Sequence, residues 1–374
     1  MIRHLGVCVL LSAVFLGLSC APQDDTPRTD RDDKDGPTPV AHLANASLKE
    51  RLAAALQHVH ARDLTTSHAF WTIFHGVLGM GLDTELVDAE TRKKVKFTDA
   101  IRIGEKIRGM EFLPSVDGID VRIVEGSGAY QGHQDQFIAE MLQWGMPQHQ
   151  KFMVGGEERV FADFCKFSKA KASLHEKQEL SWAIIVVSEI YGTDHEWTNR
   201  KKEKLHLEDV VRYELNETIE NAACGGTHRL FGLTWAYHRH RERGGKMTGV
   251  WKDTVAKIEE YKRNARKYQN KSDGSFSSNY VSKPGYAKDI QSRIGSSGHT
   301  LEWLALALTD AELRQPWMEE AAIAVCNMIL ENSSRDIDGG SLYHATHGLH
   351  IYYDRLFGPL AGMTRPVVPL PPKS

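Results

Sequence analysis

The feature that most constrains the fold is a helix start that recurs along the chain. A small or polar residue is followed by a histidine and an apolar run at His68, His133, His228, His299 and His347. A sixth apolar run begins near Leu180 without this histidine, and the commonest interval between starts is about 48 residues, which suits a helical hairpin with its loops. Amphipathic segments lie between the apolar ones. The alternation predicts an all-α fold, an α/α toroid of about five to six helical hairpins, with apolar helices inside and amphipathic helices outside.

Helical periodicity is visible in ten segments. They are 45–61, 67–80, 133–145, 176–191, 206–222, 227–241, 249–268, 298–313, 315–332 and 345–357. The first begins with a capping box, because Ser47 and Glu50 stand three residues apart before an apolar face. Strand-like alternation is concentrated in 84–125, where VKF, AIRI and IDVRIV lie between Gly and Asp turns. We therefore expect a small β insertion there, beside the helical domain.

The two ends of the chain differ in composition from its body. An apolar run at 5–18 is too short to span a bilayer comfortably and has the length of a signal-peptide core. It ends in Gly-Leu-Ser-Cys20, which resembles the bacterial lipobox, although Gly17 replaces the usual Leu. We expect a signal peptide at 1–19, lipidation at Cys20, an acidic, proline-rich tether at 20–40, a folded domain at 41–358 and a proline-rich tail at 359–374. The predicted location is the bacterial cell envelope, on a lipid anchor, with plain secretion as the alternative.

The composition excludes several classes of protein. Hydrophobic residues make up 41% and charged residues 25%, which is typical of a soluble globular chain. The net charge is only −3, so we expect no nucleic-acid partner. Within the predicted domain, Cys165, Cys224 and Cys326 are odd in number and lack CxxC spacing, which favours buried apolar thiols over a disulfide framework.

The last 150 or so residues resemble a known superfamily. An outer-helix segment ends in Gln269-Asn270 and is followed by Asp273-Gly-Ser-Phe276 and then by Asp289, just before the segment at His299. This order is similar to the repeat unit of the terpenoid-cyclase and protein-prenyltransferase toroids. The segment Tyr343-His344-Ala-Thr346 also resembles the Tyr-His-Thr of prenyltransferase β subunits, in which the histidine is a zinc ligand. The resemblance implies a toroid fold over 220–358.

Two departures from that superfamily, and one further resemblance, bear on activity. The prenyltransferase zinc site also needs an Asp and a Cys, and 295–299 holds no Cys. The cyclase acid motif DxDD occurs only at 30–33, inside the predicted tether, where a catalytic acid would be solvated. The segment 298–303 also loosely resembles the inner-helix starts of sugar-epimerase and glycan-lyase toroids. The standard activities of the superfamily are therefore not expected, and fold alone does not assign a reaction.

The histidines at the inner-helix starts are the best candidates for chemistry, because the starts gather at one mouth of a toroid. Histidine is the usual general acid or base near neutral pH. Our candidate catalytic residues are His228, His299, Glu302, His133 and Asp135. Glu302 follows His299 by three residues, so both lie on one helical face. The structural alternative is that each histidine caps a helix or bonds a neighbouring turn.

Three further features have both a functional and a structural interpretation. His344, His347 and His350 are a candidate set of ligands for a divalent metal. The segment 224–228 is either an anion cradle or a tight turn between helices. Five tryptophans in the expected inner helices either line a cavity or fill the core; they are Trp71, Trp144, Trp182, Trp235 and Trp303.

Two hypotheses for function follow. In the first, the chain is an envelope enzyme with a His-lined central cavity, acting on a glycan or an isoprenoid or other lipid-like substrate by His/carboxylate acid–base chemistry. That hypothesis predicts His228, His299 and Glu302 within about 8 Å of one another in one concave pocket, with shifted pKa values. In the second, it is a non-catalytic lipoprotein scaffold that binds a ligand or partner, with dispersed histidines bonded to backbone and a shallow or filled centre.

Overall fold

The computed structural model describes residues 45–220 and 222–371. The predicted signal peptide, Cys20 and the whole of the predicted tether lie outside these residues. The described part is mostly helical, with four small sheets. None of its helices is long and apolar enough to cross a membrane.

Six helices contact one another in a closed circuit, each touching the next and the last touching the first. In order they are α2 (Phe70–Met80), α4 (Gln136–Leu142), α6 (Ser181–Ile190), α8 (Thr227–Glu242), α10 (Ile290–Ala307) and α13 (Gly339–Phe357). They are buried on almost all sides, which matches their apolar sequences. We call them the inner helices.

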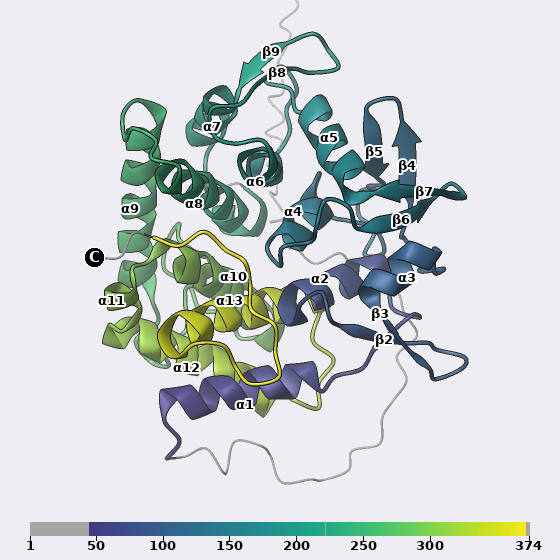
Figure 1. The fold of residues 1–374 in the computed structure, drawn as a ribbon. Coiled ribbons are helices and arrows are strands. Elements are labelled where there is room, and N and C mark those ends of the chain that lie inside the picture. Colours follow the sequence, from purple (N-terminus) through teal and green to yellow (C-terminus); the bar gives the residue numbers. More distant parts are fainter. Residues whose placement is uncertain (1–44, 221, 372–374) are drawn as a thin grey trace, which may run out of the picture.

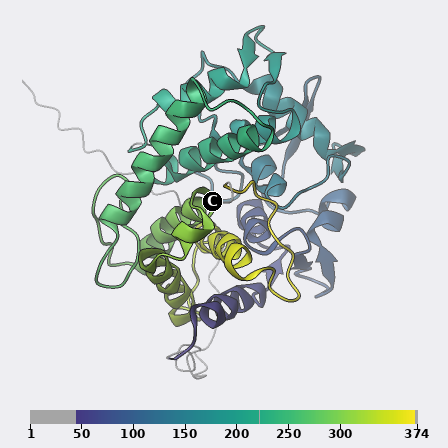
Figure 2. The same ribbon diagram turned by 60° about the vertical axis from the view of Figure 1, so that its left-hand side comes forward.

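The remaining helices lie mainly outside this circuit. They are α1 (Leu48–His60), α3 (Phe97–Ile103), α5 (Phe161–Lys171), α7 (Leu207–Asn216), α9 (Val250–Tyr268), α11 (Asp310–Leu313) and α12 (Pro316–Glu331). Figure 2 shows α9 running along the outside of α8, and α1 packs against α12 and α13. One face of α9 is buried, through Trp251, Ile258 and Ala265 among others, which is why its sequence is amphipathic.

Short β-hairpins connect the first three inner helices to the helices that follow them. The strands are β1 (Leu64–Thr65), β2 (Glu85–Val87), β3 (Lys94–Lys96), β4 (Phe112–Ser115), β5 (Gly118–Val121), β6 (Lys151–Val154), β7 (Glu157–Val160), β8 (Glu196–Thr198) and β9 (Lys204–His206). The hairpins β2–β3, β6–β7 and β8–β9 run directly into α3, α5 and α7. They lie on the upper and right-hand rim of Figure 1.

The β structure is more widely spread than the sequence predicts. Strands do occur within 84–125, but further hairpins lie at 151–160 and 196–206. The prediction was also wrong for AIRI, because 100–103 belongs to helix α3, which buries Phe97, Ala100 and Ile101. This helix has only 7 residues, too few to show a clear period. The segment of α5 was likewise not expected to be helical.

Helix boundaries follow the capping residues. The capping box of Ser47 and Glu50 is confirmed at the start of α1. The helices α10 and α13 begin at Ile290 and Gly339, earlier than predicted, because the side chains of Asp289 and Asp338 cap them. The histidines at 299 and 347 therefore lie within helices and not at helix starts.

Candidate functional site

Four imidazoles meet in the centre of the inner helices. His75, His228, His299 and His344 come from α2, α8, α10 and α13, and we call them the central histidine cluster. The ring centroids of His299 and His344 are 4.1 Å apart, and those of His228 and His299 are 5.5 Å apart. His75 lies 5.2 Å from His344. All four side chains are buried.

Glu302 of α10 is hydrogen-bonded to two histidines of α13, of which His344 belongs to the cluster. One of its carboxylate oxygens accepts a hydrogen bond from His344 Nδ1 at 2.8 Å, and the other accepts from His347 Nδ1 at 2.7 Å. The close approach depends on Gly348, since a Cβ there would lie 2.8 Å from the Glu302 backbone nitrogen. The candidates His228, His299 and Glu302 therefore belong to one contiguous group.

A second histidine–carboxylate pair, His133 and Glu179, lies on the side of the cluster nearer to solvent. His133 Nδ1 is 2.9 Å from Glu179 Oε2, and His228 Nδ1 is 3.6 Å from Glu179 Oε1. The side chains of His133 and Glu179 are each 20% exposed, against 4% for His228. Burial opposes ionisation of Glu179, but the two histidines outweigh it and hold its pKa well below the usual range. Solvent therefore meets the cluster at His133 and Glu179.

Sequence reasoning missed two residues of this centre, His75 and Glu140. Glu140, on α4, is fully buried, and its Oε1 lies 3.7 Å from His75 Nε2. Neither Glu140 oxygen accepts a hydrogen bond within the described structure. Burial and the neighbouring Glu302 charge raise the pKa of Glu140 well above its usual value. The only available signal was a polar residue inside an apolar helical run.

The cluster histidines are held as neutral imidazoles. Burial is the main cause of the low pKa values of His75, His299 and His344, and the neighbouring imidazoles lower them further. The pKa of His228 is also lowered by burial, against the opposing effect of Glu179. Neutral imidazoles can accept a proton or bind a metal.

Three other candidates lie in different surroundings. Asp135 precedes α4 and accepts a hydrogen bond from Gln134 at 2.8 Å, and burial raises its pKa. His350 Nε2 contacts His60 Nε2 of α1 at 2.8 Å, so its ring faces α1 while His344 and His347 face Glu302. His68 Nδ1 accepts from the Thr65 backbone at 2.9 Å, which is the local role of the structural alternative.

The aromatic residues divide into two groups. Trp71 packs on His75 with centroids 3.9 Å apart, and Trp182 packs on His228 at 4.8 Å. Trp144 lies 5.9 Å from His347. Trp235 and Trp303 are fully buried in the hydrophobic core. Trp71 and Trp182 belong to the same hydrophobic core as Trp235 and Trp303, so core packing accounts for these four residues.

The segment 224–228 forms a tight turn that leads into α8. Cys224 and Gly225 have positive φ, and a Cβ at Gly225 would lie 2.3 Å from the Tyr280 ring. The turn also brings Cys224 Sγ, His228 and His299 together, with one ligand atom of each within 4.8 Å of the others.

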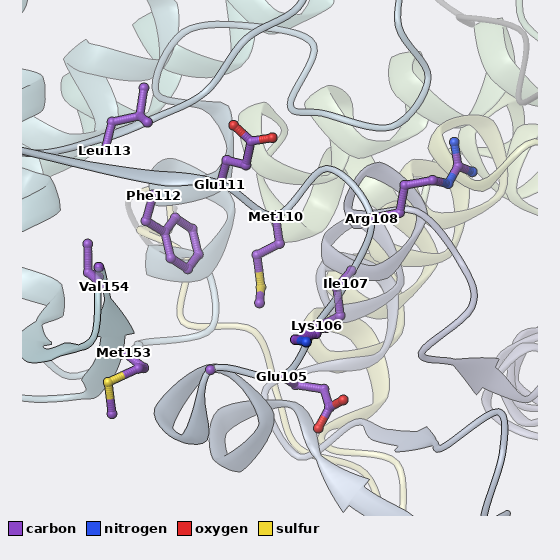
Figure 3. Close-up of a pocket in the computed structure, with 12 residues that line it drawn as sticks. Glu105, Lys106, Ile107, Arg108, Met110, Glu111, Phe112, Leu113, Met153 and Val154 are labelled. Carbon is purple, nitrogen blue, oxygen red and sulfur yellow. The ribbon is translucent and has the colours of Figure 1, made fainter.

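A surface pocket of about 600 Å³ lies at a different place (Figure 3). It is formed by the segment 104–113 and by the end of β6 at Met153 and Val154. Its wall carries charges of both signs, for example Lys106 and Glu111, around apolar side chains such as Phe112. No cluster histidine lines it, so it is separate from the histidine centre.

Comparison with protein-family models and with curated proteins found no match to this chain. The case for function therefore depends on the chemistry of the site itself.

Proposed function

We propose that this protein is an exported α/α-toroid enzyme whose central histidine cluster performs acid–base chemistry on a small ligand. The closed circuit of six inner helices, covered by amphipathic helices, supports the toroid. The cluster lies where the inner helices meet, which is the expected place for a reaction centre in such a fold.

One observation carries the proposal: a continuous series of titratable groups leads from solvent into the core. His133 and Glu179 are partly exposed, His228 lies next to Glu179, and His299 lies next to His228. Such a series can place a proton donor and a proton acceptor beside a bound substrate from which water is excluded. His228 and His299 are the proposed acid–base residues, and Glu302 is a positioning residue because it fixes His344 and His347.

The substrate class follows from the flanking aromatic rings. Trp71 and Trp182 pack on His75 and His228 and give the cluster the aromatic, apolar surroundings that suit a sugar ring or an apolar chain. A glycan or an isoprenoid-like lipid of the cell envelope therefore remains the proposed ligand.

The competing function is a non-catalytic ligand-binding scaffold. It is favoured by the backbone bonds of two cluster histidines, since His75 Nδ1 bonds the Trp71 carbonyl and His299 Nδ1 bonds the Gly295 carbonyl. Binding without turnover would favour this alternative.

The test is a ligand screen by thermal shift on the mature chain, with chito- and cello-oligosaccharides and prenyl diphosphates. A ligand that raises Tm is then assayed for turnover with wild type, His299→Gln and the exposed control His175→Gln. We expect turnover in wild type and the control, and a loss of about 100-fold or more in His299→Gln. Equal turnover in all three proteins would contradict the proposed role of His299.

The proposed envelope location has its own test. Radiolabelled palmitate should enter the full-length chain when it is expressed in a bacterium, and Cys20→Ser should abolish both the label and the membrane association. Labelling that persists in Cys20→Ser would contradict the lipid anchor.

A further inference from the structure

We propose that His75, Glu140 and His344 bind a divalent first-row transition metal ion as a two-histidine, one-carboxylate site. The three side chains come from α2, α4 and α13. This inference rests on the proposed function only in that it places the metal in the same histidine centre. It differs from the set His344, His347 and His350, with which it shares only His344.

The first argument is distance. One ligand atom from each of the three residues lies within 4.8 Å of the other two. His75 Nε2 and Glu140 Oε1 are 3.7 Å apart. Ligand atoms about 2.1 Å from a tetrahedral metal are about 3.4 Å from one another, so a small inward movement would complete the geometry.

The second argument is the orientation of the imidazoles. His75 Nδ1 lies 2.7 Å from the Trp71 carbonyl oxygen, which can only accept, so this nitrogen carries the proton. His344 Nδ1 donates in the same way to Glu302 at 2.8 Å. Each Nε2 therefore keeps its lone pair, and that of His75 accepts a hydrogen bond from the Gln136 side-chain nitrogen at 3.2 Å, which a bound metal would replace. Metal-binding histidines are characteristically fixed by such a bond from the opposite nitrogen to a carbonyl or carboxylate.

The third argument is the state of Glu140. Its side chain is fully buried, and neither carboxylate oxygen has a donor within hydrogen-bond geometry in the described structure, although the Gln136 side chain is near enough to lower its pKa. An isolated buried carboxylate is costly, and such groups are commonly paired or bound to a metal. A cation bound by Glu140 and the two imidazoles would compensate the carboxylate charge, in exchange for the Gln136 hydrogen bond to His75.

Two other groups in the centre have ligand-like spacing, and they fit less well. In the group His133, Glu179 and His228, the carboxylate already pairs with His133 at 2.9 Å. In the group Cys224, His228 and His299, no carboxylate takes part. Both rival groups contain His228, whose ring nitrogens are also buried without a hydrogen-bond partner, but only the proposed site holds a fully buried carboxylate with neither oxygen partnered.

The donor set indicates the class of metal. Imidazole with carboxylate suits zinc, iron, manganese, cobalt or nickel, and three protein ligands leave coordination positions open. His299, whose ring centroid lies 4.1 Å from that of His344, would then lie beside an open position. The metal would supply Lewis-acid activation of a bound oxygen, and His299 could exchange protons with that oxygen.

The experiment measures metal in the untagged mature chain, purified without chelator, by elemental analysis. We expect close to one transition metal ion per chain, and a loss of about fivefold or more in Glu140→Gln and in His75→Gln. His350→Gln is the matched control, a buried histidine on α13, and Glu179→Gln tests the neighbouring group; both should keep the metal. Metal lost from Glu179→Gln but kept in Glu140→Gln would overturn the assignment.

X-ray absorption on the wild type decides the question if a variant fails to fold. We expect two imidazoles and no sulfur in the metal shell, and a sulfur ligand would move the site to Cys224. A wild type without metal, whose Tm does not respond to added zinc, manganese, iron(II), cobalt or nickel, would overturn the inference. The ligand screen with His299→Gln would still test the proposed function separately.

Discussion

Two regions of the ring are built differently. In the first, from α2 to α7, the inner helices have 11, 7 and 10 residues, and hairpins join them to outer helices of 7, 11 and 10 residues. In the second, from α8 to α13, the inner helices have 16, 18 and 19 residues and the outer ones 19, 4 and 16. The first region thus combines shorter helices with β-hairpins, and its inner helices are still part of the closed circuit of contacts.

The histidine centre draws on both regions. His75, Glu140 and Glu179 come from the first region, and His228, His299 and Glu302 come from the second. The centre therefore depends on the contact between the regions, which includes a buried ion pair of Glu214 on α7 with Arg229 on α8. Glu214 Oε2 is 2.6 Å from Arg229 Nε, and the other Glu214 oxygen accepts from the Leu180 backbone at 2.7 Å.

The largest expected effect comes from breaking this contact. Glu214→Ala leaves the guanidinium of Arg229 buried without its carboxylate, which should lower the free energy of unfolding by about 3–5 kcal/mol. The free energy of unfolding is measured by urea denaturation at pH 7. Arg212→Ala is the control, because its pair with Asp253 is exposed and should contribute less than about 1 kcal/mol. Equal losses would mean that the buried pair does not join the two regions.

The next effect tests the close packing within the second region. A Cβ at Gly298 of α10 would lie 2.6 Å from the Cβ and 2.8 Å from the Cα of Ala345 on α13. Gly298→Ala should therefore cost about 2 kcal/mol, since backbone atoms cannot move aside as a flexible side chain can. Gly295→Ala, on the same helix, meets only Ser341 Oγ at 3.0 Å and Cβ at 3.6 Å and should cost clearly less. A smaller loss in Gly298→Ala than in Gly295→Ala would contradict this packing.

The same regional difference explains what the sequence could predict. The range 249–268 predicts α9 almost to the residue, because 19 residues with one buried face give a clear period. Before α5, the short hairpin β6–β7 runs directly into a helix of 11 residues, so neither period is resolved. The residues on which the sequence resemblance was based lie in the connection between α9 and α10 and in α13.

The site was predictable only where a residue marked an apparent helix start. His228, His299 and Glu302 were singled out for that reason and lie together. His75 and Glu140 were missed, because a polar residue in an apolar helix gives no indication of which neighbour it meets. That information lies in how separate helices pack, which the periodicity of one helix does not contain.

A third effect, on pH dependence, comes from a buried histidine of the second region. Burial lowers the pKa of His238 on α8 to about 3, and the charges of Arg355, Arg241 and Lys262 also lower it. As the pH falls, this histidine is protonated in the unfolded chain before it is protonated in the folded chain. The contribution of neutral His238 to the free energy of unfolding is therefore full above about pH 6.5 and is lost as the pH falls toward 3. At pH 5.5 the loss from His238 should be about 1.4 kcal/mol relative to pH 7.5.

The measurement is urea unfolding at both pH values for wild type and His238→Gln. The variant should lose about 1.4 kcal/mol less than the wild type on acidification. His149→Gln, an exposed histidine of the first region, should follow the wild type. A variant that loses as much as the wild type would show that His238 is not held neutral.

The smallest effect tests whether the hairpins matter beyond their own turns. Gly156 in the β6–β7 turn has φ 85° and nothing within 4 Å of an added Cβ, so Gly156→Ala should cost about 1 kcal/mol through backbone strain alone. Gly244, after α8, has φ 76° and equally open surroundings, and it is the matched position in the second region. Equal losses in the two alanine variants are expected if each turn is local. A much larger loss at Gly156 would mean that the hairpin, and not only the circuit of inner helices, holds the first region together.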